Sequence, residues 1–177
     1  MTHTKIRSLV PGTRKRRGAK NHLVNSDFNF DFINIGTWNV RTLNTEGNLE
    51  ILLKQMKRLN IKVLGVSETH WSSNEDDVFE MEGYVFIHST RKDGIRRQGV
   101  AFVIEKELSN SITGYEQHSE RLASLSLETR TGPVTFLQIY APDSSYDDET
   151  VEDFYDTVQR KIDSIPKKTT IYLLGDF

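Results

Sequence analysis

Residues 32–40, Phe-Ile-Asn-Ile-Gly-Thr-Trp-Asn-Val, form the first stretch of the chain in which large apolar residues follow one another closely. A short apolar run with few charges predicts a strand that is buried on both faces of a sheet. One polar residue near its end, Asn39, lies among large apolar ones. Taken alone, Asn39 is most simply explained as a side chain that ties down the strand end through backbone hydrogen bonds.

The composition is that of an ordinary globular domain. The 177 residues are 36% hydrophobic and 27% charged, which is enough for one domain with a substantial core. The sequence has no apolar run of the roughly 20 residues that cross a bilayer and no apolar leader, so we expect an intracellular protein, nuclear or cytoplasmic, that is not secreted and does not bind a membrane. The absence of cysteine excludes a disulfide framework and a thiolate zinc site.

The charge is distributed unevenly along the chain. Residues 1–26 carry seven basic residues and no acidic one, so the other 151 residues hold 16 basic residues (23 minus 7) against 25 acidic ones. We therefore expect residues 1–26 to be a disordered basic arm and residues 27–177 to be the folded part. Such an arm either contacts nucleic acid or is simply solvated, and the sequence leaves both readings open.

Beyond residue 40 the chain alternates predicted strands and helices. Apolar residues spaced three and four apart predict a helix from Asn48 to Leu59, and a strand follows at Ile61–Val66. Strand, helix and strand then form a right-handed crossover with two parallel strands. Further strands are predicted at residues 84–88, 99–104, 122–128, 134–140 and 170–174, the third and fourth of them as a hairpin with Gly132 and Pro133 in its turn. A second helix is predicted from about Val151 to Ile162, ended by Pro166.

Four predicted strands end in polar residues that an ordinary core would not contain: Asn39, Glu68, Tyr140 and Asp176. Each has an ordinary explanation by itself, such as a cap, an ion pair, a hydroxyl at the surface or a turn. Together they indicate a site, because parallel strands bring their carboxyl ends to one edge of a sheet. An amide and two carboxylates at such an edge suit an oxygen-preferring cation such as Mg²⁺.

Six sequence blocks in order resemble the endonuclease/exonuclease/phosphatase superfamily. The blocks are Thr37-Trp38-Asn39-Val40, Ser67-Glu68-Thr69-His70, Gly83-Tyr84, Gly99-Val100-Ala101, Ile139-Tyr140-Ala141-Pro142 and Gly175-Asp176-Phe177. The sequences of these blocks are most similar to those of the endonucleases of non-LTR retrotransposons and of craniofacial development protein 2-like sequences. The resemblance implies an α/β fold, a partial four-layered α/β sandwich of the deoxyribonuclease I-like type whose C-terminal half is missing.

The same resemblance implies Mg²⁺-dependent phosphodiester hydrolysis on nucleic acid, with DNA favoured and Mn²⁺ as a possible substitute. It implies that Glu68 is a metal ligand and that Asn39 holds the metal site or the scissile phosphate. Tyr140 would contact the phosphate, and Asp176 would orient or deprotonate the attacking water. These residue types suit the chemistry, which needs an offset for phosphoryl charge, a base for water and a hydrogen-bond donor.

The sequence departs from the superfamily after residue 177. The family continues the Gly-Asp-Phe block with asparagine and ends in a Ser-Asp-His type block with a catalytic histidine, which this chain lacks. We therefore expect the 177-residue form to be inactive alone. Two alternatives stay open: a non-catalytic protein that binds nucleic acid or another protein, and a phosphoesterase for inositol phosphates or sphingomyelin. The sequence does not indicate an oligomeric state.

Overall fold

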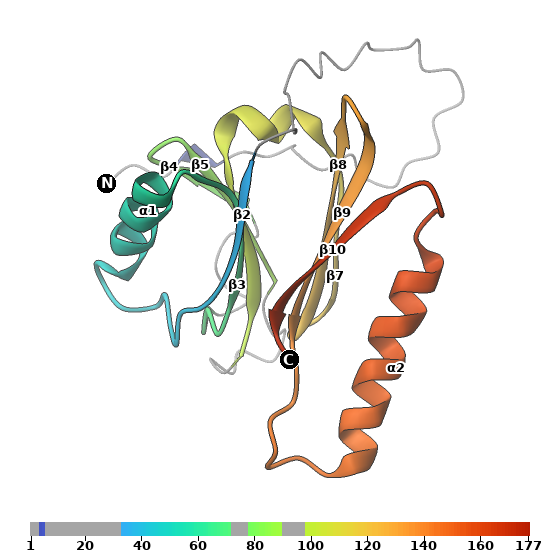
Figure 1. The fold of residues 1–177 in the computed structure, drawn as a ribbon. Helices are drawn as coiled ribbons and strands as arrows, with labels where there is room; N and C mark the ends of the chain where they lie inside the picture. The colour runs from blue at the N-terminus through green and yellow to red at the C-terminus, as the bar shows by residue number, and fades with distance from the viewer. Residues whose placement is uncertain (1–3, 6–32, 72–77, 90–97) are drawn as a thin grey trace.

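In the computed structural model, the structure describes residues 4–5, 33–71, 78–89 and 98–177. These residues form two β-sheets that face each other, with one helix against the outer side of each sheet (Figure 1). The prediction of a layered α/β sandwich is confirmed. Of the predicted basic arm, only residues 4–5 are among the described residues, so its disorder stays a prediction. No helix in the described part of the chain is both long and apolar enough to cross a membrane.

The first sheet carries the predicted crossover. Its strand order is β1-β4-β5-β6-β3-β2, and β2 and β3 run parallel with α1 between them in sequence. The elements are β1 Thr4–Lys5, β2 Asn34–Asn39, α1 Asn48–Leu59, β3 Ile61–Ser67, β4 Val78–Met81, β5 Tyr84–Ser89 and β6 Val100–Glu105. Strand β6 lies antiparallel to both β3 and β5, so the predicted pair of strands before and after residues 90–97 is confirmed.

The second sheet has the order β10-β9-β8-β7. Its elements, with the helices around them, are η2 Lys106–Ser111, β7 Ile112–Ser119, β8 Leu122–Thr129, β9 Gly132–Tyr140, α2 Asp148–Ser164 and β10 Thr170–Asp176. Strands β8 and β9 form the predicted hairpin, and β10 runs parallel to β9.

The turn of this hairpin differs from the prediction. Gly132 and Pro133 are the first residues of β9, so the turn consists of Arg130 and Thr131. Proline is tolerated there because Pro133 pairs with Glu128 alone, whereas pairing of β9 with β10 begins at Val134.

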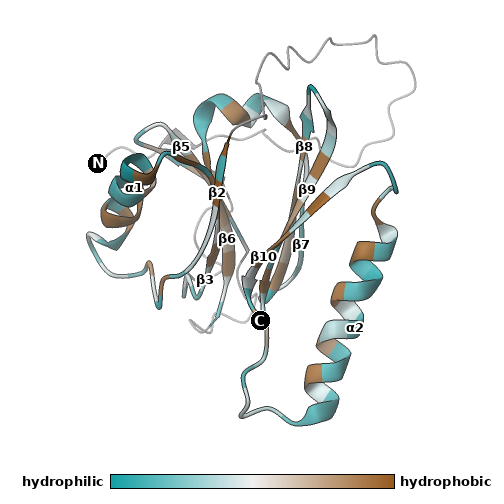
Figure 2. Ribbon diagram, in the orientation of Figure 1, coloured by the Kyte–Doolittle hydropathy of each residue, from teal (hydrophilic) through white to brown (hydrophobic). Residues whose placement is uncertain are grey.

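Three apolar clusters make the core. The largest lies between the two sheets and contains Phe102, Leu125 and Phe136, each fully buried. The second joins α1 to the first sheet, because Leu52, Leu53 and Met56 fall on one face of the helix. The third joins α2 to the second sheet through Val158. Figure 2 shows apolar residues along strands of both sheets and in both helices α1 and α2.

The strand at residues 32–40 is less buried than its sequence predicts. Residue 32 lies outside the described residues, and β2 is the last strand of the first sheet, where Thr37 is exposed and Trp38 is 41% exposed. The prediction of burial on both faces is therefore wrong. An apolar run predicts burial, but it cannot distinguish a central strand from a strand at the edge of the described sheet.

Candidate functional site at the strand ends

The four polar residues at the strand ends lie together in the structure. Asn39 is the last residue of β2, Glu68 follows β3, and Tyr140 and Asp176 end β9 and β10. Two of these strands belong to each sheet, and the carboxyl ends of all four point the same way, toward the end marked C in Figure 1. We call Asn39, Glu68, Tyr140 and Asp176 the strand-end cluster.

The amide of Asn39 connects the two carboxylates of the cluster. Its Nδ2 donates to Glu68 Oε1 at 2.6 Å and to Asp176 Oδ2 at 2.9 Å. Its Oδ1 accepts from the backbone N–H of Arg41 at 3.1 Å, which turns the NH₂ group toward the carboxylates. Tyr140 OH donates to the same Glu68 Oε1 at 3.1 Å. The ordinary reading of Asn39 as a backbone tie is thus incomplete, since its amide also bonds two carboxylates.

The backbone at Glu68 is in an unusual conformation. Glu68 has φ +58° and His70 has φ +56°, in the left-handed region that non-glycine residues seldom adopt. The segment is held by hydrogen bonds from Thr69 N to Gly99 O at 3.2 Å and from His70 N to Gln98 O at 2.9 Å. Backbone of this kind costs about 1–3 kcal/mol per residue and persists where the surroundings fix it, often at functional sites.

Glycine 175 explains how Asp176 reaches the cluster. Gly175 has φ +145°, and a Cβ there would lie 1.9 Å from the backbone oxygen of Ile139 on the neighbouring strand. Only glycine allows this close approach of β10 to β9. The pairing continues past the cluster, because Ala141 N donates to Asp176 O at 2.9 Å.

Arg121 contacts both the backbone and the ring of Tyr140. It is 9% exposed, and its Nη1 donates to Tyr140 O at 3.2 Å and to Ala141 O at 3.1 Å. Its guanidinium lies 4.9 Å from the centre of the Tyr140 ring. Burial of the phenol, and after it the charge of Glu68 and the bond to Glu68, raise the pKa of Tyr140 above its usual value. Tyr140 therefore stays protonated at neutral pH and remains a hydrogen-bond donor.

Comparison with known proteins identifies the fold. No protein-family model matches the chain. Craniofacial development protein 2 from Bos taurus is 32% identical over 147 residues, which are 81% of this chain and 24% of that protein. An endonuclease/exonuclease/phosphatase family protein from Leptotrichia buccalis superposes with a TM-score of 0.59 at 16% identity, over 82% of this chain and 66% of that one. The chain has the endonuclease/exonuclease/phosphatase fold.

Two further solved structures share the endonuclease/exonuclease/phosphatase fold. The 3′ phosphatase NExo from Neisseria, bound to a product DNA hairpin, has a TM-score of 0.57 at 17% identity, over 82% of this chain and 58% of that one. The endonuclease domain of TRAS1, a telomere-specific non-LTR retrotransposon, has a TM-score of 0.52 at 15% identity, over 79% and 56%. The chain thus spans about a quarter of the curated relative and 56–66% of these three solved chains.

The residue types of the strand-end cluster are ones that can take part in holding a Mg²⁺ ion. No group of three or more acidic or histidine side chains within metal-binding reach occurs among the residues that the structure describes. Mg²⁺ does not require one, because it usually takes one or two protein carboxylates and completes its shell with water and phosphate oxygens. Glu68 would supply one such carboxylate, and the Asn39 amide holds it beside a second carboxylate, that of Asp176.

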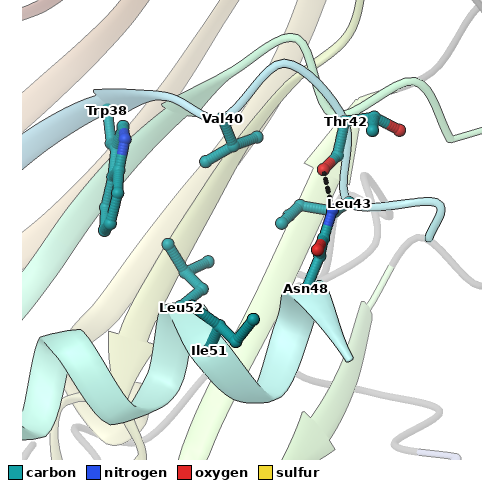
Figure 3. A pocket seen from close by; sticks show the side chains of 7 residues that line it. All are labelled: Trp38, Val40, Thr42, Leu43, Asn48, Ile51 and Leu52. Atoms are coloured by element: carbon teal, nitrogen blue, oxygen red, sulfur yellow. Dashed lines mark hydrogen bonds between the residues drawn. The ribbon is translucent and has the colours of Figure 1, made fainter. Parts of the chain in front are cut away.

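A neighbouring hollow is separate from the cluster. It has a volume of about 140 Å³ and lies between the end of β2 and the start of α1 (Figure 3). Its lining is mostly apolar, and none of the four cluster residues contributes to it. Within it Asn48 Nδ2 donates to Thr42 O at 3.0 Å, which fixes the loop to the first turn of α1.

Sequence reasoning missed two residues next to the cluster, Arg121 and Gln138. Arg121 lies in the tight connection at the start of β8 and has no sequence signal of its own. Gln138 is a buried amide within the apolar run of β9 and is fully inaccessible to solvent. A long polar side chain in the middle of a buried strand is a recognisable signal, since such groups need partners.

Proposed function

We propose that the strand-end cluster is a site for divalent-cation-dependent hydrolysis of phosphodiesters in nucleic acid. The observation that carries the proposal is the Asn39 amide, which joins carboxylates from both sheets while a phenol donates to one of them. A purely structural strand end has no need of two carboxylates in contact with one amide. The shared fold with the Neisseria phosphatase and the TRAS1 endonuclease domain supports the same reading.

Each residue has a role that follows from its contacts. Glu68 would hold Mg²⁺, or Mn²⁺ in its place, and the cation would offset negative charge on the phosphoryl oxygens. Asn39 keeps the carboxylates of Glu68 and Asp176 at fixed positions. Tyr140 would turn its hydroxyl away from Glu68 and donate a hydrogen bond to a phosphate oxygen, and Asp176 would accept a proton from the attacking water.

DNA is the favoured substrate. The Neisseria structure contains a product DNA hairpin, and TRAS1 is a non-LTR retrotransposon. The seven basic residues within residues 1–26 add a charge that suits a phosphate backbone. Binding through them would weaken steeply as the salt concentration rises.

We expect the 177-residue chain to be inactive on DNA by itself. The strand-end cluster offers an amide, a phenol and two carboxylates, and none of these readily gives a proton to the leaving alkoxide at neutral pH. A phosphodiester with a better leaving group avoids this requirement. Bis(4-nitrophenyl) phosphate releases 4-nitrophenolate, which leaves as an anion without needing a proton.

The test is therefore hydrolysis of bis(4-nitrophenyl) phosphate with Mg²⁺ or Mn²⁺, followed by absorbance. We expect cation-dependent turnover that Glu68→Gln abolishes and that Glu46→Gln, at an exposed loop carboxylate, leaves unchanged. Equal rates in Glu68→Gln and the unaltered chain would refute the proposal. Oligonucleotide binding without any hydrolysis of the activated diester would favour a non-catalytic binding role instead.

A second assay separates substrate classes. Supercoiled plasmid, an inositol phosphate and sphingomyelin are each incubated with the chain and Mn²⁺. We expect this chain alone to leave the plasmid intact and to release no product from the other two. Nicking that Glu68→Gln abolishes would refute the expected inactivity on DNA. Preferential release of inorganic phosphate or phosphocholine would move the assignment to the phosphoesterase alternative.

A further inference from the structure

A buried polar contact crosses from one sheet to the other directly beneath the strand-end cluster. Gln138 on β9 is fully buried, and its Nε2 donates to Ser67 Oγ on β3 at 2.8 Å. Ser67 itself is 1% exposed. Gln138 Oε1 has no hydrogen-bond partner among the described residues. Phe136 and Tyr140, two residues before and after Gln138 on β9, both belong to the apolar cluster between the sheets.

Gly65 provides the space that this contact needs. A Cβ at position 65 would lie 1.8 Å from Gln138 Oε1 and 2.8 Å from its Cδ. Even an alanine at position 65 would therefore displace the amide. An unpaired buried acceptor costs about 1–3 kcal/mol, and an apolar side chain at position 138 would avoid that cost. The amide therefore calls for an explanation other than core stability.

The position of the contact suggests that explanation. Gln138 precedes Tyr140 by two residues, so both lie on the same face of β9, and Ser67 directly precedes Glu68. The bond between Gln138 and Ser67 is thus one layer below the bond between Tyr140 and Glu68. Apolar packing is non-directional and leaves two facing sheets free to slide by small amounts, whereas a hydrogen bond has a defined length and direction.

We propose that Gln138 is a positioning residue for the strand-end cluster. Through Ser67 it fixes β3 of the first sheet against β9 of the second. This keeps Glu68 within reach of Tyr140, and Asn39 within reach of Asp176. The consequence for hydrolysis rests on the function proposed above, whereas the positioning itself concerns the protein without cation or substrate.

Two variants remove the same bond from opposite sides. Gln138→Met keeps the length of the side chain and loses the donor, and Ser67→Ala loses the acceptor. Thr135→Val is the matched control, because Thr135 is also buried and its hydroxyl pairs with Ser126 at 2.9 Å, but within the second sheet. The readout is hydrogen exchange of the Asn39 side-chain amide in ¹H–¹⁵N NMR spectra of the full 177-residue chain, recorded with EDTA.

We expect exchange of the Asn39 amide protons to become about fivefold faster in both Gln138→Met and Ser67→Ala, the factor that corresponds to a hydrogen bond of about 1 kcal/mol. In Thr135→Val the rate should stay within twofold of the unaltered chain, although its Tm falls. Unchanged exchange in either Gln138→Met or Ser67→Ala would overturn the proposal, because both remove one and the same bond.

Hydrolysis of the activated diester then separates positioning from function. If the unaltered chain hydrolyses it, kcat should fall at least fivefold in Gln138→Met with little change in KM, and the Thr135→Val rate should be unchanged. An unchanged kcat together with faster amide exchange would overturn the catalytic consequence. If the unaltered chain has no activity, the function proposal fails, and the NMR result still decides whether Gln138 positions the cluster.

Discussion

Asn39→Asp is a sharp perturbation of the strand-end cluster. It removes both Nδ2 donations, to Glu68 at 2.6 Å and to Asp176 at 2.9 Å, and places a third carboxylate between two others. Hydrogen bonds to charged groups contribute about 1.5–3 kcal/mol each. Like charges about 3 Å apart repel by about 1.4 kcal/mol per pair even at the dielectric constant of water. After relaxation of the exposed carboxylates, we expect a net loss of about 2–4 kcal/mol in the free energy of unfolding.

A divalent cation should reverse this loss. Three carboxylates at one point bind Mg²⁺ or Mn²⁺ more tightly than two carboxylates and an amide, since hard cations prefer charged oxygens. A cation present at about 100 times its Kd stabilises the folded state by about 2.7 kcal/mol. Asn39→Asp should therefore regain most of its lost stability with the cation, while the unaltered chain gains less.

The assay is urea unfolding followed by tryptophan fluorescence, once with EDTA and once with Mn²⁺. The matched control is Asn34→Asp on the same strand, which makes the same change in charge. Asn34 is exposed, and its Nδ2 donates to the backbone oxygen of Leu59 at 3.0 Å, away from the strand-end cluster. Equal destabilisation by the two substitutions in EDTA, or a failure of Mn²⁺ to restore Asn39→Asp, would refute the geometry argued for the cluster.

Three further predictions concern the scaffold. Burial, and after it the nearby charge of Lys161, lower the pKa of His118 below its ordinary 6.5. The unfolded chain therefore binds a proton at His118 more strongly than the folded chain does, and stability is lost as the pH falls below 6.5. His118→Gln should make Tm less dependent on pH between about pH 7 and pH 5, and an unaltered pH dependence would count against it. Gly175→Ala should destabilise the chain by about 3 kcal/mol or more in urea unfolding, because the added Cβ would lie 1.9 Å from Ile139 O. The control is Gly114→Ala, where no atom lies within 4 Å of the added Cβ, and it should change stability by less than about 1 kcal/mol. Leu53→Ala should cost about 2–5 kcal/mol, because Leu53 is fully buried between α1 and the first sheet, and a loss below about 1 kcal/mol would show that the helix is packed differently.

Sequence patterns predicted the helices and strands whose apolar spacing is clear within a short segment. The helical spacing of Leu52, Leu53 and Met56 placed α1, and the apolar run after it placed β3, because each signal lies within a dozen residues. Strand β7 was missed. Its sequence, Ile-Thr-Gly-Tyr-Glu-Gln-His-Ser, lies at the edge of the second sheet and has neither a clear alternation nor an apolar run.

The cluster was predictable as a set of residue types but not as a geometry. A polar residue at the end of an apolar run singled out Asn39, Glu68, Tyr140 and Asp176 separately. Their hydrogen bonds depend on how two sheets face each other, which no local pattern encodes. Gln138 and Gly65 illustrate the limit, since they lie 73 residues apart and each makes sense only beside the other. The catalytic roles of the four residues stay predictions.

Cation binding tests the central claim most directly. Isothermal titration of the 177-residue chain with Mn²⁺ should show one class of site, lost in Glu68→Gln and weakened in Asp176→Asn. Glu46→Gln, which removes the same charge from an exposed loop, should bind as the unaltered chain does. Mn²⁺ binding that is equally strong in Glu68→Gln and Glu46→Gln would contradict the assignment of the strand-end cluster as a metal and phosphate site.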